Sequence, residues 1–276
     1  MIESNDYLHM LSLFLRFREI LFYSPCHRIF IMVYWLYKRY RGEFELKKLP
    51  FGVQNFKQII TDNYVYIDKT QYIYNLINKE VYYFAADPKG FGKSLLIDTI
   101  REVFSGDKEL FKGLWIYDSD YSFKKHPVLR FDMNHIPNGT PDELEDSLSK
   151  ALLNRVRAED LDLYGEWPPE LFQCLIEGLY KKYNQKVVVL VDDYDKFSLN
   201  SIYDKKTVHA NNRVICDLYE SFQSARPYIK FLLITGESIF LRLKYNDLLD
   251  ITRTKEYCNI CGISIDSLEK SFNVRH

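Results

Sequence analysis

Short apolar runs alternate with stretches of helical periodicity along most of this chain. Each apolar run is followed by polar or turn-forming residues, as expected for buried strands. The predicted strands are residues 81–86, 127–132, 187–191 and 228–234. Apolar residues recur at helical spacing between them, and the predicted helices are residues 93–104, 140–156, 168–183 and 206–224. Strands that alternate with helices indicate a mostly parallel sheet with right-handed crossovers, which is an α/β fold.

Two of these elements have clear local signals. The run from Val187 to Val191 is continuously apolar, which is typical of a parallel strand buried on both faces. At the start of the second helix, Thr140 is predicted to cap the first turn and Pro141 to occupy the first helical position. Glu143 is expected to complete a capping box.

Residues 1–47 differ from the rest of the chain. Two aromatic and aliphatic runs are interrupted there by arginines and a proline. Three interpretations remain open: short helices packed on the main domain, a segment lying on a membrane surface, or poorly folded sequence outside the domain. In the second interpretation, residues 11–41 make a peripheral membrane contact, with Lys38, Arg39 and Arg41 flanking the aromatic side chains.

Composition narrows the class of protein. Of the 276 residues, 47% are apolar and 27% are charged, which excludes a disordered or low-complexity chain. The formal net charge of −1 gives no clear signal for nucleic acid. Five widely spread cysteines indicate a reducing compartment, so we expect a cytoplasmic protein. No N-terminal apolar run approaches the roughly 20 residues of a spanning helix, so no transmembrane span is predicted.

A glycine-containing stretch after the first strand, Asp87-Pro-Lys-Gly-Phe-Gly-Lys-Ser94, carries the main chemical signal. A phosphate-binding loop needs inward-facing backbone amides, and glycine lets the backbone approach the phosphate closely. It also needs a lysine for the β- and γ-phosphates and a hydroxyl for Mg²⁺. Gly92, Lys93 and Ser94 supply these groups at a helix N-terminus, which favours anions. Asp87 stands where such a loop has its first glycine, and Gly90 supplies part of the missing flexibility.

Acidic and polar residues follow the two later strands. Asp192 and Asp193 come directly after the run at 187–191, at the edge where open α/β sheets bind ligands. An aspartate there can hold Mg²⁺, and the next acid can orient and deprotonate an attacking water. Thr235 ends the following strand and is a candidate contact for the γ-phosphate or that water. Each pattern alone is also explained by a surface turn or helix cap, but together they favour one nucleotide site.

Two weaker patterns favour structural roles. Cys258 and Cys261 have CxxC spacing without the second pair that a zinc site needs, so we interpret them as core thiols. Asp195 and Lys196 follow the acidic pair and are predicted to form a loop salt bridge.

With these motifs in place, residues 48–271 resemble the AAA-ATPase-like family, P-loop proteins often fused to a C-terminal PD-(D/E)XK nuclease-like domain. The matching segments, in order, are LPFGVQNFKQII, YVYIDKT, DPKGFGKSL, PVLRFDM, VVVLVDDYDK, ITGES, NDLLDIT and CGIS. The resemblance implies a three-layer P-loop NTPase core at residues 48–255, with the phosphate loop following the central strand. Residues 1–47 would be an extension and residues 256–276 a short, truncated C-terminal helical part. The nuclease-like domain is expected to be absent.

The resemblance also implies ATP and Mg²⁺ as cofactors and a role for each site residue. Lys93 would bind the β- and γ-phosphates, while Ser94 and Asp192 would hold Mg²⁺. Asp193 would act as the base and Thr235 as the sensor. The residues implied in nucleotide binding are Lys89, Gly90, Phe91, Gly92, Lys93, Ser94 and Leu95. Relatives have glutamate at position 193, and a reacting group displaced by about 1 Å can lose around a hundredfold in rate.

Several functions remain open at this point. We expect a Mg²⁺-dependent protein that hydrolyses ATP to ADP and phosphate. The main alternative is a nucleotide-binding module with weak or no hydrolysis that acts as a binding or regulatory protein. A decayed fragment that binds nothing is a third interpretation. A small-molecule kinase is disfavoured, because no acceptor site can be identified.

Overall fold

The computed structural model describes residues 48, 50, 52–79, 82–196, 205–245 and 247–262. The predictions for residues 1–47, including the membrane contact at 11–41, lie outside the described residues. Of the predicted C-terminal helical segment, residues 256–262 form turns, and residues 263–276 lie outside the described range. None of the described helices is long and apolar enough to cross a membrane.

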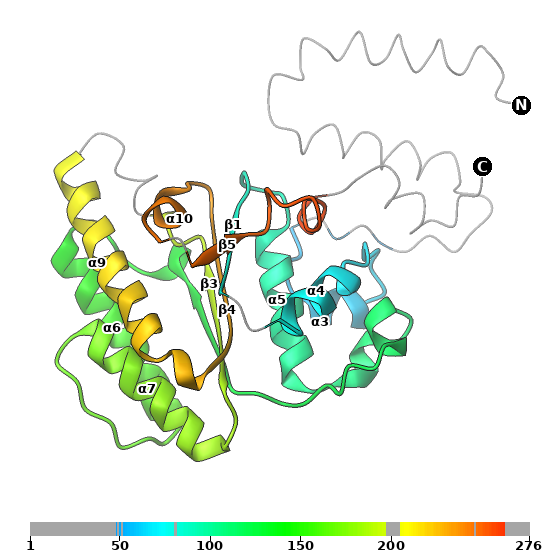
Figure 1. Ribbon diagram of the computed structural model, residues 1–276, viewed down its shortest axis with the longest axis horizontal. Coiled ribbons are helices and arrows are strands. Elements are labelled where there is room, and N and C mark those ends of the chain that lie inside the picture. Colours follow the sequence, from blue (N-terminus) through cyan, green and yellow to red (C-terminus); the bar gives the residue numbers. More distant parts are fainter. Residues whose placement is uncertain are drawn as a thin grey trace, which may run out of the picture.

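A parallel sheet of five strands lies at the centre of the described residues (Figure 1). The strand order is β2-β3-β4-β1-β5, and every neighbouring pair is parallel. The strands are β1 Tyr82–Ala86, β2 Val128–Asp132, β3 Val187–Asp192, β4 Ile229–Gly236 and β5 Leu248–Asp250. The four predicted strands and the α/β class are confirmed. The sequence pattern does not predict β5, because three residues are too few to show a periodicity.

The strand before the phosphate loop is not the central one, so that prediction is wrong. β4 lies in the middle of the sheet, between β1 and β3, and β1 is next to the edge strand β5. The registers pair Ala85 with Thr235 and Val191 with Ile234. The carboxyl ends of β1, β4 and β3 therefore lie side by side, although β4 comes last of the three in sequence.

Helices cover both faces of this sheet (Figure 1). On one face pack α6 Pro141–Ala158, α7 Pro168–Tyr183 and α9 Lys205–Ser224; on the other pack α3 Phe56–Thr61, α4 Thr70–Ile77 and α5 Lys93–Ser105. The shorter elements are η1 Lys108–Phe111, η2 Trp115–Asp118, η3 Met133–His135, η4 Arg226–Tyr228 and α10 Phe240–Lys244. Side chains alternate along β3, so Val189 packs with the first group and Leu190 with the second. Every residue of β3 is buried, as the continuous apolar run predicts.

The Asp68-Lys69-Thr70 motif ties distant segments together. The Asp68 carboxylate accepts hydrogen bonds from the Thr70 hydroxyl at 2.6 Å and from the first backbone amide of η2 at 2.7 Å. The Lys69 ammonium donates to the carbonyl of Asn259 at 2.7 Å. This motif therefore fixes the turns at 254–262 against the N-terminal side of the domain.

Thr140 caps α6 as predicted, but Glu143 does not make the predicted contact. The Thr140 hydroxyl accepts a hydrogen bond from the Glu143 amide at 3.1 Å, and Pro141 is the first helical residue. The Glu143 carboxylate accepts from the amide of Gly139 at 2.7 Å, one residue before the cap, so the capping box is not the predicted one. The extended backbone of Thr140 leaves the preceding amide nearer to the carboxylate.

Replacing Thr140 by alanine should lower the free energy of unfolding by about 1 kcal/mol, because the Glu143 amide loses its acceptor. Urea denaturation of wild type and Thr140→Ala measures this difference. Thr140→Ser keeps the hydroxyl and serves as the matched control. Equal losses in both variants would show that the methyl group, and not the cap, is responsible.

Candidate functional site

The phosphate loop joins the end of β1 to the first turn of α5. Gly90 and Gly92 have φ angles of +85° and +88°, a left-handed conformation that other residues adopt at a cost. Asp87 is not among the residues with positive φ, so the backbone does not require glycine at its position. The Asp87 amide donates to the Gly236 carbonyl at 3.2 Å, which fixes the loop to the end of β4. The amides of the first helical turn after Gly92 have no partner within the helix and can bind an anion.

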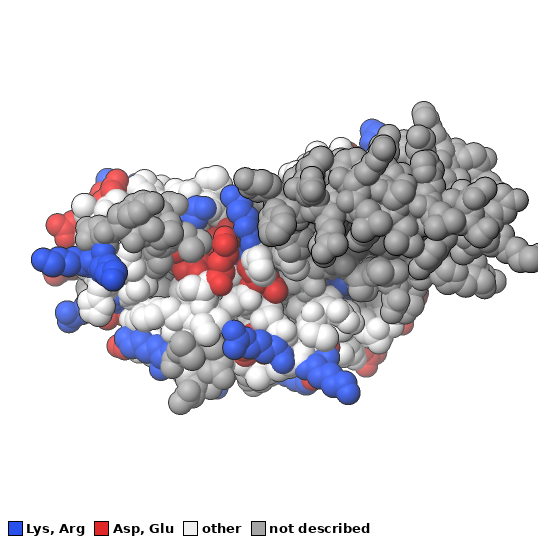
Figure 2. Space-filling view, turned by 90° about the horizontal axis from the view of Figure 1, so that it is seen from above, with Lys and Arg blue, Asp and Glu red and all other residues white. Residues whose placement is uncertain are grey.

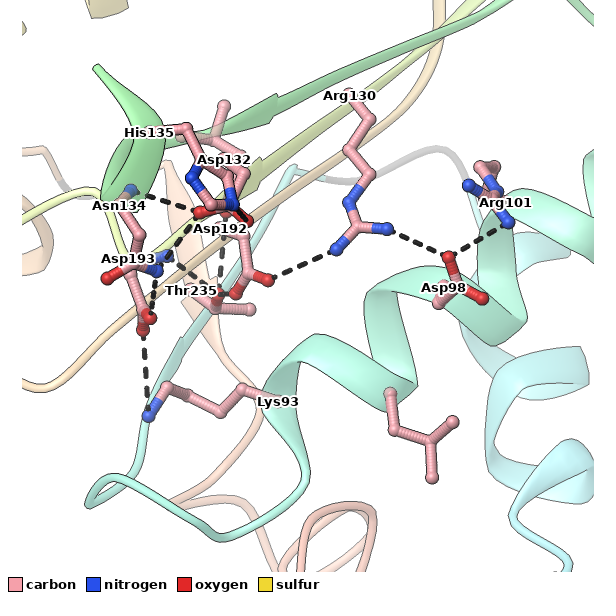
Figure 3. Close-up of polar contacts among 12 residues, drawn as sticks. Lys93, Asp98, Arg101, Arg130, Asp132, Asn134, His135, Asp192, Asp193 and Thr235 are labelled. Atoms are coloured by element: carbon pink, nitrogen blue, oxygen red, sulfur yellow. Dashed lines mark hydrogen bonds and ion pairs between the residues drawn. The ribbon is translucent and has the colours of Figure 1, made fainter. Parts of the chain in front are cut away.

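The Lys93 side chain extends from the start of α5 toward Asp193 (Figure 3). Its side chain is only 4% exposed. The ammonium donates to the carbonyls of Asp87 at 2.6 Å and Pro88 at 3.2 Å, and lies 3.9 Å from a carboxylate oxygen of Asp193. The predicted phosphate-binding lysine and the predicted acidic pair therefore face one another.

Asp192 is fully buried at the end of β3. One carboxylate oxygen accepts from the Thr235 hydroxyl at 2.7 Å, and the Ser94 hydroxyl also hydrogen-bonds to this carboxylate. The other oxygen, Oδ2, has no hydrogen-bond partner. Burial raises the pKa of Asp192, while the bonds from Thr235 and Ser94 oppose the rise. The nearest cation to Oδ2 is an Arg130 nitrogen at 3.6 Å, which is too far for a hydrogen bond, so a bound cation could lower the cost of burying this oxygen.

Asp193 is held in place by its own backbone and by η3. Its φ of +50° puts it in the left-handed region, which aspartate tolerates better than most residues. The Asn134 amide group donates to a carboxylate oxygen of Asp193 at 2.7 Å and to the Asp132 carboxylate at 3.0 Å. The sequence patterns do not indicate Asn134, since it approaches Asp193 only through the pairing of β2 with β3.

A charged network extends from Asp192 into α5. One Nη atom of Arg130, on β2, donates to Asp98 at 2.8 Å, and the other lies 3.6 Å from Oδ2 of Asp192. Arg101 reaches the same oxygen of Asp98 at 3.0 Å. The other Asp98 oxygen accepts from the Phe56 amide at 2.7 Å. Arg130 interrupts the apolar run of β2, and this is the signal from which its place in the network could have been found.

The turn at 257–262 contacts the phosphate loop. The Gly262 amide donates to the Phe91 carbonyl at 2.7 Å, and the Cys261 thiol hydrogen-bonds to the half-buried Asp87 carboxylate. Burial raises the pKa of Asp87, while Cys261 and Lys93 oppose the rise. Cys258 is exposed, so the interpretation of both cysteines as core thiols is wrong for this residue: the turn directs it to solvent.

The structure brings together most of the predicted site residues. They form one connected set. Lys93 lies near Asp193, and the Asp193 amide donates to the Thr235 hydroxyl at 3.4 Å. Asp192 in turn hydrogen-bonds to Thr235 and Ser94. In the loop, Lys89, Gly90 and Gly92 are exposed, whereas Phe91 is partly buried. Leu95 is partly buried and packs against the core beside α5, so only its backbone is placed to contact a phosphate.

Asp195 does not have its predicted role. It is buried and accepts hydrogen bonds from the backbone amides of Glu237, at 3.0 Å, and Ser238. The predicted salt bridge with Lys196 is therefore replaced by a contact that shapes the turn after β4. Because β4 lies next to β3, the turn after β4 brings these amides to the buried carboxylate.

Acidic and basic side chains lie next to one another on the face seen in Figure 2, where Asp and Glu gather near the middle with Lys and Arg beside them. Among the described residues, no group of three or more His, Cys, Asp or Glu is placed to hold a metal ion. Mg²⁺ in nucleotide sites commonly uses only one or two protein ligands besides phosphate and water. The pair of Ser94 and Asp192 fits that requirement.

Comparisons with known proteins identify the family of this chain. A family model described as "Predicted AAA-ATPase" matches residues 50–244. A protein of Azotobacter chroococcum mcd 1, described as "Uncharacterized protein in vnfD 5'region", is 31% identical over 232 residues. The match covers 82% of this chain and 45% of that relative, so the chain spans less than half of the relative's length. No solved structure matches.

Replacing Asp192 by asparagine should stabilise the protein when no metal is present. Burial raises the pKa of Asp192, so the folded state holds this proton more tightly and ionisation at pH 7 opposes folding. We expect a gain on the order of 0.5–2 kcal/mol in the free energy of unfolding. The gain should shrink as the pH falls, because the wild-type carboxyl group then becomes neutral. Denaturant titration with a chelator at pH 7 and at lower pH tests this, and a destabilised variant at pH 7 would contradict it.

Proposed function

Since this chain belongs to the AAA-ATPase-like family, we propose that it binds ATP with Mg²⁺ and hydrolyses it to ADP and phosphate. Family membership supports nucleotide binding in general, and the site residues of this chain support the more specific reaction. The proposed domain is residues 48–255, with residues 53–68 bordering the adenine.

One observation carries the proposal: the Lys93 ammonium and the acidic end of β3 share a site. The nitrogen lies 3.9 Å from Asp193, whose neighbour Asp192 hydrogen-bonds to Ser94 on the lysine's own helix. A phosphate needs a cation and backbone amides, whereas Mg²⁺ needs oxygen ligands. The loop and the first turn of α5 supply the first set, and Ser94 with Asp192 at the end of β3 supplies the second.

Ser94 and Asp192 are the proposed metal ligands. Both offer oxygen atoms, and Asp192 has a buried oxygen without a hydrogen-bond partner. Bound Mg²⁺ would neutralise negative charge on the phosphates during transfer. Thr235 holds the other Asp192 oxygen at 2.7 Å, so its contact with the carboxylate supports an orienting role beside the proposed sensor role.

Asp193 is the proposed base. Its side chain is 22% exposed, so water can reach it, and Asn134 fixes one of its two oxygens. An acid in this position can orient a water molecule and accept its proton. Lys93 would bind the β- and γ-phosphates and offset the charge that develops on them.

A second candidate function is nucleotide binding with weak or no hydrolysis. Asp193 is one methylene shorter than the family's glutamate, which sets its carboxylate back from the water. In addition, the Lys93 ammonium lies close enough to the Asp87 carboxylate to lower the Asp87 pKa. A negative charge on Asp87, within the loop, opposes phosphate binding. These two carboxylates favour a slow enzyme over a fast one.

Lys93→Ala should abolish ATP hydrolysis and weaken nucleotide binding by at least tenfold, because the phosphate loses its buried cation. Phosphate release and isothermal titration calorimetry with Mg²⁺-ATP measure the two effects. Lys150→Ala, which removes an exposed lysine paired with Asp146 on α6, is the matched control. If wild type and Lys93→Ala bind ATP equally well, the proposed function is wrong.

Asp193→Glu separates the two candidate functions. If the short carboxylate limits the rate, the variant should hydrolyse ATP roughly tenfold or more faster, because the carboxylate then reaches the water. Nucleotide affinity should change little. Single-turnover measurements of wild type and Asp193→Glu give the rate of the chemical step. An unchanged or lower rate would show that the length of residue 193 does not limit hydrolysis.

A further inference from the structure

Arg130 connects the two elements that carry the proposed metal ligands. It lies on β2, and its guanidinium group reaches Asp98 of α5 with one nitrogen and Asp192 of β3 with the other (Figure 3). The distances are 2.8 Å and 3.6 Å. Both aspartates are at most 1% exposed. The bridge is therefore formed between two buried carboxylates through the two arms of one side chain.

Asp98 lies on the same helix as Ser94, one of the proposed metal ligands. Asp98 follows Ser94 by four residues on α5, so the two side chains lie on the same face of the helix, one turn apart. A contact that holds Asp98 against β2 also fixes the rotation of α5 about its axis. That rotation determines whether the Ser94 hydroxyl faces Asp192.

The contacts of Arg130 are not those of a side chain that serves packing alone. Its Nε atom is buried without a hydrogen-bond partner, and buried ion pairs are in general weak contributors to stability. A planar guanidinium with fixed nitrogens is, however, well suited to hold two carboxylates at a set separation. The Asp98 charge offsets part of that of Arg130.

We propose that Arg130 is a positioning residue for the metal: it fixes Asp192 relative to the first turn of α5, which carries Ser94. The inference rests on the proposed function, since it concerns the same metal ligands. Partners of metal-ligating carboxylates commonly contribute ten- to hundredfold in metal affinity. Arg130 fits this behaviour through Asp192 directly and through Asp98 indirectly.

The test compares Arg130→Lys, Arg130→Gln and Arg101→Gln. Lysine keeps the charge but has a single nitrogen that cannot hold both carboxylates, and glutamine removes the charge. Arg101→Gln is the matched control, because Arg101 pairs with the same Asp98 oxygen at 3.0 Å and makes no described contact with Asp192. Mn²⁺ serves as the probe, and its affinity for the complex with a non-hydrolysable ATP analogue is measured by electron paramagnetic resonance.

The proposal expects both Arg130 variants to lose roughly ten- to hundredfold in Mn²⁺ affinity and Arg101→Gln to stay within about twofold of wild type. Nucleotide affinity without metal should be unchanged in all three, which also shows that the loop is folded. Wild-type Mn²⁺ affinity in Arg130→Lys would overturn the proposal, and so would tighter Mn²⁺ binding in Arg130→Gln, since charge alone would then explain the effect.

Failure of the proposed function gives a different result. If the wild-type protein binds no nucleotide, the proposed function and this inference are both refuted. If wild type binds the nucleotide with Mn²⁺ but Arg130→Lys does so equally well, only the positioning role is refuted. If Arg130→Lys loses metal-free nucleotide binding, the Mn²⁺ titration of Arg130→Gln decides: a ten- to hundredfold loss of Mn²⁺ affinity supports the proposal, and wild-type or tighter affinity overturns it.

Discussion

The parallel pairing of β1, β4 and β3 is the constraint on which the candidate site depends. Parallel strands end at the same edge of a sheet, so the loop after β1, Thr235 at the end of β4 and Asp192 at the end of β3 become neighbours. The apolar side chains of these strands are buried on both faces and fix the register. A shift of one residue in β3 would turn Asp192 toward the helices of one face and remove it from the loop.

This arrangement places several charges where water is largely excluded. Asp192, Asp98 and Lys93 are all almost fully buried. Isolated buried charges are costly, and the described contacts compensate for much of that cost: carbonyls surround Lys93, and Arg130 lies between the two aspartates. The compensation is incomplete at Oδ2 of Asp192. A buried carboxylate oxygen without a hydrogen bond, beside a hydroxyl, is consistent with the cation site proposed above.

The sequence predicts the elements that depend on local patterns. The strand at 187–191, the cap at Thr140 and the helix that begins at Lys93 are all determined by neighbouring residues. Other features depend on contacts between distant segments. Arg130 and Asn134 reach the site only because β2 pairs with β3, and nothing near them in the chain specifies that neighbour. The central position of β4 was likewise not predictable, because it depends on how three crossovers are arranged.

Asp193 shows how backbone conformation and chemistry can compete at one residue. Its φ of +50° is more accessible to aspartate than to glutamate, because a short polar side chain can form local hydrogen bonds there. The shorter residue therefore suits the turn after β3, and Asn134 holds its carboxylate toward the site at 2.7 Å. A glutamate would reach further but would adopt this φ less readily than aspartate does. Turn geometry therefore favours the aspartate at this position, whereas the reach of the proposed base favours a glutamate.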